Sequence, residues 1–513
     1  MSNKRILLPI VILLLFHFLI RAHQITRQVP HIDEGFHVSR AIVVWDFDRN
    51  PGQFMHGKLL LYYWLGLFDL QPVSALHVSR TAIAIFSLLL AALIYRLGLK
   101  LANPTVGLAA MALYSIFPYS VFFERLAMAD AFAATFGSVV AWRSLVFARR
   151  PSWREGGTLG AFITLATMAK LTMGPVALLP VLAALAYYDW QPSNWRQQIR
   201  PWIKTYVPPL VLAASMLIVA WLPIILPALY SHFVVSDPYK LLSENNLQQL
   251  DSTSPLTAFL DFVLPQIVFL TSEVVLIVWA IAAIGLLVWP KTRRHAIFLV
   301  GWVMLITLFS LTFANQPRPR YYVPTLTPMV LLIVMGLWHL WQIQVSSPHL
   351  RAATRGAIAI GVAAWIAVFA APFAYFAATD PLELRLSSRE EDLYLTGTQS
   401  GPAIEQAVAL LESIDPMPEH IYSNWGTCQI FYFYTDAFSV GCLALADQPE
   451  EITRYPVAFI VRNGDEGGEP SRYGLQWTRL GRFERDGVPF TVEVWRIENP
   501  DAAQTLTTES HME

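Results

Sequence analysis

Charged residues are scarce in this sequence. Only 14% of its 513 residues are Asp, Glu, Lys or Arg, whereas about a quarter are charged in a typical soluble domain. Hydrophobic residues make up 55%. The composition therefore excludes an ordinary soluble protein and predicts an integral membrane protein. The formal net charge of -1 leaves no basic excess to offset phosphates, which argues against a nucleic-acid partner.

Several familiar motifs are also missing. The sequence contains no Cys-x-x-Cys pair, no P-loop and no dinucleotide-binding glycine fingerprint. It has no internal repeat and no low-complexity tract. Only two cysteines occur, Cys428 and Cys442. Counting alone leaves a disulfide and two separate buried thiols equally open.

Long apolar runs, in contrast, are abundant. A helix that crosses a bilayer needs about 20 residues, and the runs predict a polytopic α-helical membrane protein with about 11 transmembrane helices. The first run is read as a retained helix because no small-residue cleavage site follows it. The runs lie at residues 6–20, 77–97, 104–123, 130–148, 157–172, 174–188, 206–230, 263–289, 296–314, 323–344 and 356–378.

Basic residues predict the orientation of these helices. Short cytoplasmic loops concentrate Lys and Arg, and the alternation is regular if the N-terminus is cytoplasmic. We therefore expect a multi-pass protein of the cell (plasma) membrane with everything after about residue 379 outside the cytoplasm. The inner connections then hold Arg96, Lys100, Arg149, Arg150, Arg154, Arg196, Arg200, Lys204, Lys291, Arg293, Arg294, Arg351 and Arg355.

The two parts of the chain differ in character. Residues 1–378 form the expected membrane domain, with a long first outer loop at 21–76, and residues 379–513 form a small extracytoplasmic α/β domain. In the second part "AIEQAVALLESI" has helical periodicity, whereas "HIYS", "FSVGCLA" and "VAFIVRN" favour short strands. "RFERDGVPFTVEVWRI" predicts a hairpin around Asp486 and Gly487. Both cysteines fall in this domain, where an oxidising compartment permits a disulfide.

Charged residues recur in the expected outer connections. Adjacent acids occur in "PHIDEGFH", a mixed group in "ERLAMADAF", a lysine in "MAKLTMGP" and two arginines in "NQPRPRYYVP". Each has a plain alternative: an acid at a helix start complements the helix dipole, and tyrosines are common at membrane interfaces. Their combination on one side is more specific. The residues concerned are Asp33, Glu34, Glu124, Arg125, Asp130, Lys170, Arg318, Arg320 and Tyr321.

At this point the chain resembles a known family. "HIDEGFH", "FMHGKLLLYYWLG", "ERLAMADAF", "KLTMGP" and "RPRYYVPTLTP" look, in this order, like landmarks of the C-type glycosyltransferases related to protein O-mannosyltransferases and lipid A aminoarabinose transferases. The resemblance covers roughly residues 5–340. It implies an inverting glycosyltransferase that moves a sugar from a polyprenyl-phosphate-linked donor to an acceptor hydroxyl at the outer membrane face. One departure is His56-Gly57-Lys58, where many relatives have His-Pro-Pro or His-Gly-Pro.

The resemblance also implies roles for individual residues. Asp33 matches the catalytic acid of the first loop, Glu34 its neighbour and Asp130 the acid of the second loop. Lys170 and Arg320 match basic positions that would face the lipid phosphate. Candidate substrate-binding residues are His56, Lys58, Arg125, Lys170, Arg318, Arg320 and Tyr321.

The sequence leaves several possibilities for the cofactor and the partners. A Mg or Mn ion could bind through Asp33, Glu34 or His56 because oxygen ligands suit these metals, but no ligand spacing demands one. The expected partners are membrane lipid, a polyprenyl-phosphate sugar and a protein, glycolipid or cell-wall acceptor. The main alternative is a multi-span transporter or flippase, although the sequence lacks the repeats and midplane site that transporters tend to show. A catalytically inactive receptor or scaffold is a third reading.

Overall fold

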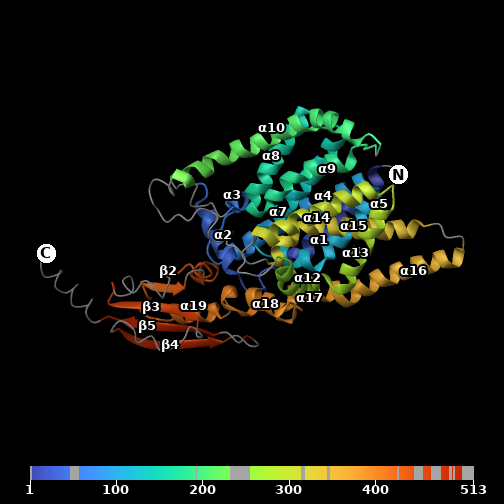
Figure 1. Cartoon of the computed structure of the whole chain (residues 1–513). Coiled ribbons are helices and arrows are strands. Elements are labelled where there is room, and N and C mark those ends of the chain that lie inside the picture. The colour runs from blue at the N-terminus through green and yellow to red at the C-terminus, as the bar shows by residue number, and fades with distance from the viewer. Residues whose placement is uncertain are drawn as a thin grey trace. The chain divides into compact units, whose positions relative to one another are not determined.

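The computed structural model shows a mainly helical chain with one small sheet (Figure 1). It describes residues 3–46, 57–191, 193–230, 255–313, 318–343, 347–401, 403–424, 427–443, 454–463, 475–484, 488 and 491–499. The chain divides into two compact units. Unit 1 comprises residues 1–23, 44–64 and 81–378, and unit 2 comprises residues 24–43, 65–80 and 379–513.

Unit 1 is built from helices. Its elements in chain order are α1 (Asn3–Ala22), α3 (Leu59–Leu65), α4 (Ala75–Leu101), α5 (Pro104–Ile116), α6 (Pro118–Glu124), α7 (Asp130–Arg149), α8 (Trp153–Ala169), η2 (Leu171–Leu178), α9 (Leu179–Tyr187), α10 (Trp195–Tyr230), α11 (Pro255–Ala258), η4 (Phe259–Val263), α12 (Leu264–Thr271), α13 (Glu273–Val288), α14 (Arg293–Phe313), η5 (Pro319–Thr325), α15 (Leu326–Gln342), α16 (Pro348–Trp365), η6 (Ile366–Ala370) and α17 (Ala371–Thr379). The first residues of α4 and the ends of α3 and α17 belong to unit 2.

The predicted class of polytopic helical membrane protein is confirmed. Within the described residues each apolar run falls mainly on helix. Among the described residues, six helices are long and apolar enough to cross a membrane, or up to eight if each of two bent pairs counts as one span. Ile6–Ala22 and Leu171–Tyr187 are shorter apolar helices. The count of eleven crossings stays a prediction.

Close packing of α7, α8, α9 and α10 forms one side of unit 1. Figure 1 shows α8 and α10 side by side. Their approach depends on glycine, because a Cβ on Gly156 would lie only 2.4 Å from the carbonyl oxygen of Pro209. Helix α8 ends at Ala169, and Lys170 follows it in extended backbone.

Unit 2 combines short helices with a five-stranded sheet. Its helical elements are α2 (Ile32–Val43), η7 (Pro381–Glu383), α18 (Ser388–Glu391), η8 (Asp392–Thr396), η9 (Thr398–Ser400), α19 (Ile404–Glu412), η10 (Thr427–Gln429) and η11 (Phe431–Phe433). Its strands are β1 (Ile421–Asn424), β2 (Val440–Leu443), β3 (Val457–Asn463), β4 (Gln476–Glu484) and β5 (Thr491–Glu498).

The sheet has the order β2-β1-β3-β5-β4. β1 runs parallel to β2 and β3, whereas β5 runs antiparallel to β3 and β4. The predicted C-terminal α/β fold is thus confirmed, including all the strands named from the sequence and the β4–β5 hairpin. Its turn residues, Asp486 and Gly487, lie outside the described residues.

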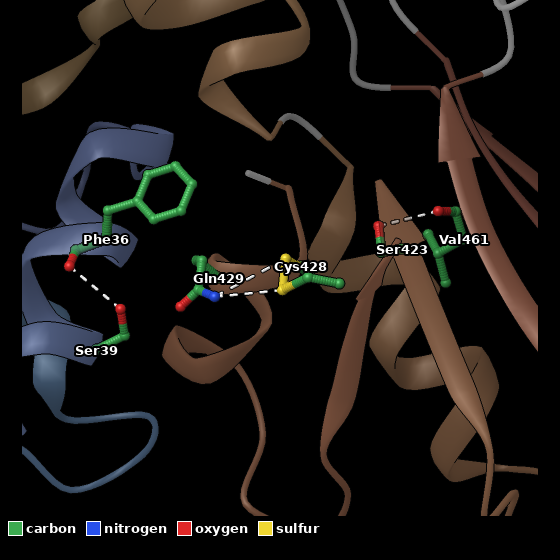
Figure 2. The surroundings of a disulfide bond; sticks show 7 residues. Phe36, Ser39, Ser423, Cys428, Gln429 and Val461 are labelled. Atoms are coloured by element: carbon green, nitrogen blue, oxygen red, sulfur yellow. Dashed lines mark hydrogen bonds between the residues drawn. A yellow bond between two sulfur atoms is a disulfide. The ribbon is translucent and has the colours of Figure 1, made fainter. Parts of the chain in front are cut away.

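The two cysteines form a disulfide (Figure 2). Cys428 and Cys442 are bonded, with their Cα atoms 5.3 Å apart, which settles the choice that the sequence left open. Gln429 donates from Nε2 to Sγ of Cys442 at 3.2 Å. A Cβ on Gly35 would lie 2.7 Å from Cβ of Gln429, so α2 packs directly against the disulfide segment. A disulfide agrees with the predicted extracytoplasmic position of this part of the chain.

We expect a reporter fused to the C-terminus to reveal this position. Alkaline phosphatase, which matures only in an oxidising compartment, should be active there, and a reporter that works only in the cytoplasm should be silent, because the basic connections alternate from a cytoplasmic N-terminus. A reporter fused after Arg150, in a predicted inner connection, is the matched control. Cytoplasmic activity at the C-terminus would contradict the predicted topology.

Candidate functional site

The acidic pair of unit 2 lies in the first turn of α2, and the two acids have different environments. His31 precedes the helix, and its ring Nδ1 accepts a hydrogen bond from the backbone N–H of Asp33 at 3.0 Å. The carboxylate of Glu34 accepts in return from the backbone N–H of His31 at 2.9 Å. This reciprocal arrangement satisfies two N–H groups that a helix start leaves unpaired, in the manner of a capping box.

A buried arginine holds Glu34 in place. Arg80 donates from Nε and Nη2 to the two carboxylate oxygens of Glu34 at 2.8 and 2.7 Å, and both side chains are fully buried. Its remaining donors reach the carbonyl oxygens of Ile25, Gln28 and Val29 at 2.8 to 3.0 Å. One guanidinium thus fixes both the helix start and the segment that leads into it.

Asp33 is partly exposed, whereas its neighbour is completely enclosed. Glu34 supplies the carboxylate that closes the cap, and Asp33 contributes its backbone N–H. Adjacent residues on a helix lie about 100° apart, so the Glu34–Arg80 anchor sets the direction of Asp33 without sharing its surroundings. Arg80 is not among the residues predicted from the sequence, although an arginine at the start of an apolar helix is a signal for a buried partner.

We expect Arg80→Gln to destabilise the protein strongly. Removing one partner of a buried ion pair leaves the other charge uncompensated, which costs about 3–5 kcal/mol. Thermal melting of the purified protein measures the effect. The double variant with Glu34→Gln should recover part of the loss, and Asp33→Asn, the matched control one residue away, should melt like the wild type. Equal melting temperatures for all variants would contradict a structural role for Glu34.

A second charged cluster lies in unit 1. Lys170 Nζ lies 2.5 Å from Oδ1 of Asp130, with exposed side-chain fractions of only 8% and 2%. Asp130 is the first residue of α7, and Lys170 follows the last residue of α8 in extended backbone. Each charge therefore sits at the helix end whose dipole it complements. This ion pair holds the starts of α7 and η2 together.

The first turns of η5 extend this cluster. Lys170 Nζ lies 4.9 Å from the ring centroid of Tyr321, and the guanidinium carbon of Arg320 lies 5.8 Å from the same centroid. Arg320 also contacts Sδ of Met128 at 3.8 Å. Tyr119 donates its hydroxyl proton to the carbonyl oxygen of Pro319, which ties η5 to α6. The two cations predicted to face a phosphate thus share one aromatic ring.

Arg318 is the residue before η5 and is partly buried. It therefore lies two residues from Arg320, next to the cluster.

The segment around Gly57 approaches Leu171, the residue that follows Lys170. Gly57 has a φ of +62°, and a Cβ there would lie 2.6 Å from Cβ of Leu171. The backbone N–H of Leu171 donates to the carbonyl oxygen of Gly57 at 2.9 Å. A glycine is required at this position for both reasons. The carbonyl of Lys58 accepts from two N–H groups of the following helix, and His56 lies outside the described residues.

Two further charged residues of "ERLAMADAF" are buried at the end of α1. Arg125 donates from Nη1 to the carbonyl oxygens of Ile20, Arg21 and His23 at 2.9 to 3.0 Å, as expected for a cation at a helix C-terminus. Glu124 accepts from Arg21 and from the hydroxyl of Tyr114, each at 2.5 Å. Arg21, which is not predicted from the sequence, also donates to Ser115 of α5 and Ser120 of α6 and so closes α1 onto both helices. A substrate contact for Arg125 stays a prediction.

Two of the three candidate metal ligands, Asp33 and Glu34, lie within the described residues. Both oxygens of Glu34 are engaged by Arg80, and His56 lies outside the described residues. Within the part of the chain that the structure describes, no three His, Cys, Asp or Glu side chains are grouped so that they could hold a metal ion.

The chain has the fold of the C-type glycosyltransferases. The crystal structure of ArnT from Cupriavidus metallidurans in the apo state matches with a TM-score of 0.58 at 15% identity, over 96% of this chain and 98% of that chain. The same protein bound to undecaprenyl phosphate matches with a TM-score of 0.54 at 13% identity and the same coverage.

A further structural match is the archaeal oligosaccharyltransferase AglB from Archaeoglobus fulgidus, in complex with an inhibitory peptide and a dolichol-phosphate. Its TM-score is 0.50 at 12% identity, over 85% of this chain and 64% of that chain. Residues 65–223 match the family described as dolichyl-phosphate-mannose-protein mannosyltransferase. No curated protein matches the chain in sequence. The resemblance to C-type glycosyltransferases predicted from the sequence is confirmed.

Proposed function

We propose that this protein is an inverting glycosyltransferase that moves a sugar from a polyprenyl-phosphate-linked donor to an acceptor hydroxyl at the outer membrane face. The observation that carries this proposal is the cluster of Lys170, Arg320 and Tyr321 in unit 1. Two cations beside one ring, near the start of two apolar helices, suit a phosphate held close to lipid. Bound undecaprenyl phosphate and dolichol-phosphate in two structures of the same fold support this class of donor.

The leaving group explains why cations are needed there. When the bond between the anomeric carbon and the phosphate oxygen breaks, negative charge grows on the phosphate. Lys170 and Arg320 stabilise this charge through short charge-assisted hydrogen bonds, and their effect is greatest away from water. The ion pair with Asp130 positions Lys170 in the absence of a donor. A separate general acid is unnecessary because a phosphate ester leaves as a stable anion.

The acceptor hydroxyl needs a base, and we assign this role to Asp33. Its carboxylate takes the hydroxyl proton while the oxygen bonds to the anomeric carbon from the side opposite the phosphate. One such displacement inverts the anomeric configuration and releases polyprenyl phosphate. Glu34 is a positioning residue, since its bonds to Arg80 and His31 fix the turn that presents Asp33.

A panel of radiolabelled polyprenyl-phosphate sugars tests this function. Membranes that contain the protein should transfer the label from one donor to an acceptor, and the new glycosidic bond should have the opposite anomeric configuration. A product with retained configuration would contradict the single displacement. The acceptor fraction, whether protein, glycolipid or cell-wall polymer, identifies the acceptor class in the same experiment.

A further inference from the structure

A second group of cations in unit 1 surrounds a cavity of about 660 Å³. Its lining includes Arg149 at the end of α7, Asp189 after α9, and Lys291 and Arg294 around the start of α14. Three positive charges against one carboxylate leave this lining with a formal excess of two positive charges. These residues come from three connections that are far apart in the sequence but lie at one end of the helices.

This cavity is distant from the cluster of Lys170 and Arg320. Asp130 and Arg149 are the first and last residues of α7. A straight helix of 20 residues is about 30 Å long, so the two basic groups lie at opposite ends of the same helix. The cavity therefore belongs to the end of unit 1 that the basic residues predict to be cytoplasmic, and it does not contribute to the proposed donor site.

The cavity is accessible and its charges are only partly neutralised. Arg294 pairs with Asp189 at 2.6 Å, but the side chains are 49% and 88% exposed. Such an exposed pair is weak, and an incoming anion can compete for the arginine. Arg149 lies 5.9 Å from the ring centroid of Tyr187. Arg294 and His295 are in the first turn of α14, whose helix dipole also favours an anion.

Aromatic side chains around this cavity suit the depth of lipid headgroups. Tyr187, Tyr188 and Tyr206 line it, and the ring of Trp202 stacks on Tyr206 with centroids 5.5 Å apart. Tyr and Trp concentrate where a bilayer meets water. An aromatic belt beside basic residues fits the phosphate of a membrane lipid.

Exposed apolar side chains on the same helices distinguish a lipid from a soluble anion. Ile297 follows Arg294 by three residues on α14 and is 39% exposed, and Ile203 precedes Tyr206 by three residues on α10 and is 45% exposed. Residues three apart are neighbours on a helix surface. A phosphate bound in the cavity would therefore have apolar surface next to it for acyl chains.

We propose that this cavity binds the phosphate headgroup of an anionic phospholipid in the cytoplasmic leaflet. Basic pockets between transmembrane helices on the cytoplasmic side suit such headgroups, since each Lys or Arg near the surface adds to the attraction. The bound lipid would fasten the ends of α7 and α9 to the start of α14. This site is independent of the proposed glycosyl transfer.

Native mass spectrometry of the detergent-purified full-length protein tests this site. Phosphatidylglycerol should be retained by the wild type and bound roughly tenfold or more weakly by the double variant Arg149→Gln, Lys291→Gln. The matched control is the double variant Arg154→Gln, Lys204→Gln, which loses the same charge from exposed positions outside the cavity and should retain the lipid. Phosphatidylcholine, added as the neutral lipid, should bind all three proteins equally weakly.

Two results would overturn the proposal. Equal retention of phosphatidylglycerol by the cavity variant and the control variant would show that the cavity does not select the lipid. Displacement of the lipid by equimolar inorganic phosphate would show a site for a soluble anion. If the cavity double variant does not fold, the single variants Arg149→Gln and Lys291→Gln replace it, each with an intermediate loss expected, and wild-type affinity in both would equally reject the site.

Discussion

Asp33→Asn should slow sugar transfer by roughly 100- to 10,000-fold, the range of a lost general base. The substitution keeps the size and polarity of the side chain but removes its basicity. The acceptor hydroxyl must then attack the anomeric carbon without a base to take its proton, whereas donor binding depends on other residues. Single-turnover transfer at saturating donor measures the chemical step directly.

Asp33→Asn should fold normally, because the neighbouring residue Glu34 holds the start of the helix. Because Glu34 and Arg80 close the start of α2, Asp33→Asn should melt at the wild-type temperature. Donor binding, measured by competition with unlabelled polyprenyl phosphate, should also be unchanged. A folded variant that transfers sugar at the wild-type rate would remove Asp33 from the mechanism, and Asp130 would become the preferred base.

The largest effect on donor use is expected for the cations of unit 1. Lys170→Gln or Arg320→Gln should lower kcat/KM for the donor by roughly 10- to 1,000-fold, because each removes a charge that stabilises the departing phosphate. Lys170→Gln also removes the partner of the buried Asp130. The double variant Asp130→Asn, Lys170→Gln leaves no unpaired buried carboxylate. It should therefore recover stability while donor use stays low.

The conservative and remote variants provide the controls. Lys170→Arg should keep more activity than Lys170→Gln, since the positive charge remains. Arg154→Gln, at the far end of the helices, should leave donor kinetics unchanged. Unaltered donor kinetics with both Lys170 and Arg320 replaced by Gln would leave only a structural role for the two cations.

The sequence predicts the helical class and the C-terminal fold because both depend on local patterns. Apolar runs of helical length can be recognised without knowing which helices they pack against. The strands at residues 457–463 and 491–498 have the hydrophobic side chains expected of a buried sheet. The resemblance to glycosyltransferases rests on the order of short segments. Lys170 and Arg320 are predicted from the sequence to face one phosphate, and in the structure both lie beside the ring of Tyr321.

What the sequence could not predict depends on contacts between distant residues. Asp33 and Glu34 are adjacent acids of similar chemistry, and only the position of Arg80, 46 residues further on, makes Glu34 a structural anchor. Gly57 likewise depends on a distant contact, because a Cβ at this position would collide with Leu171. The cavity beside Arg149 likewise joins three connections whose basic residues had been read only as topology signals.

The central claim is that the protein breaks the bond between a sugar and a polyprenyl phosphate. The most direct measurement uses the purified protein in liposomes with a doubly labelled donor, one label on the sugar and one on the lipid. The account predicts that the sugar label moves to the acceptor while the lipid label appears as polyprenyl phosphate, and that Asp33→Asn loses both signals together. Movement of the intact donor across the bilayer, with sugar and lipid still joined, would contradict it and establish a transporter.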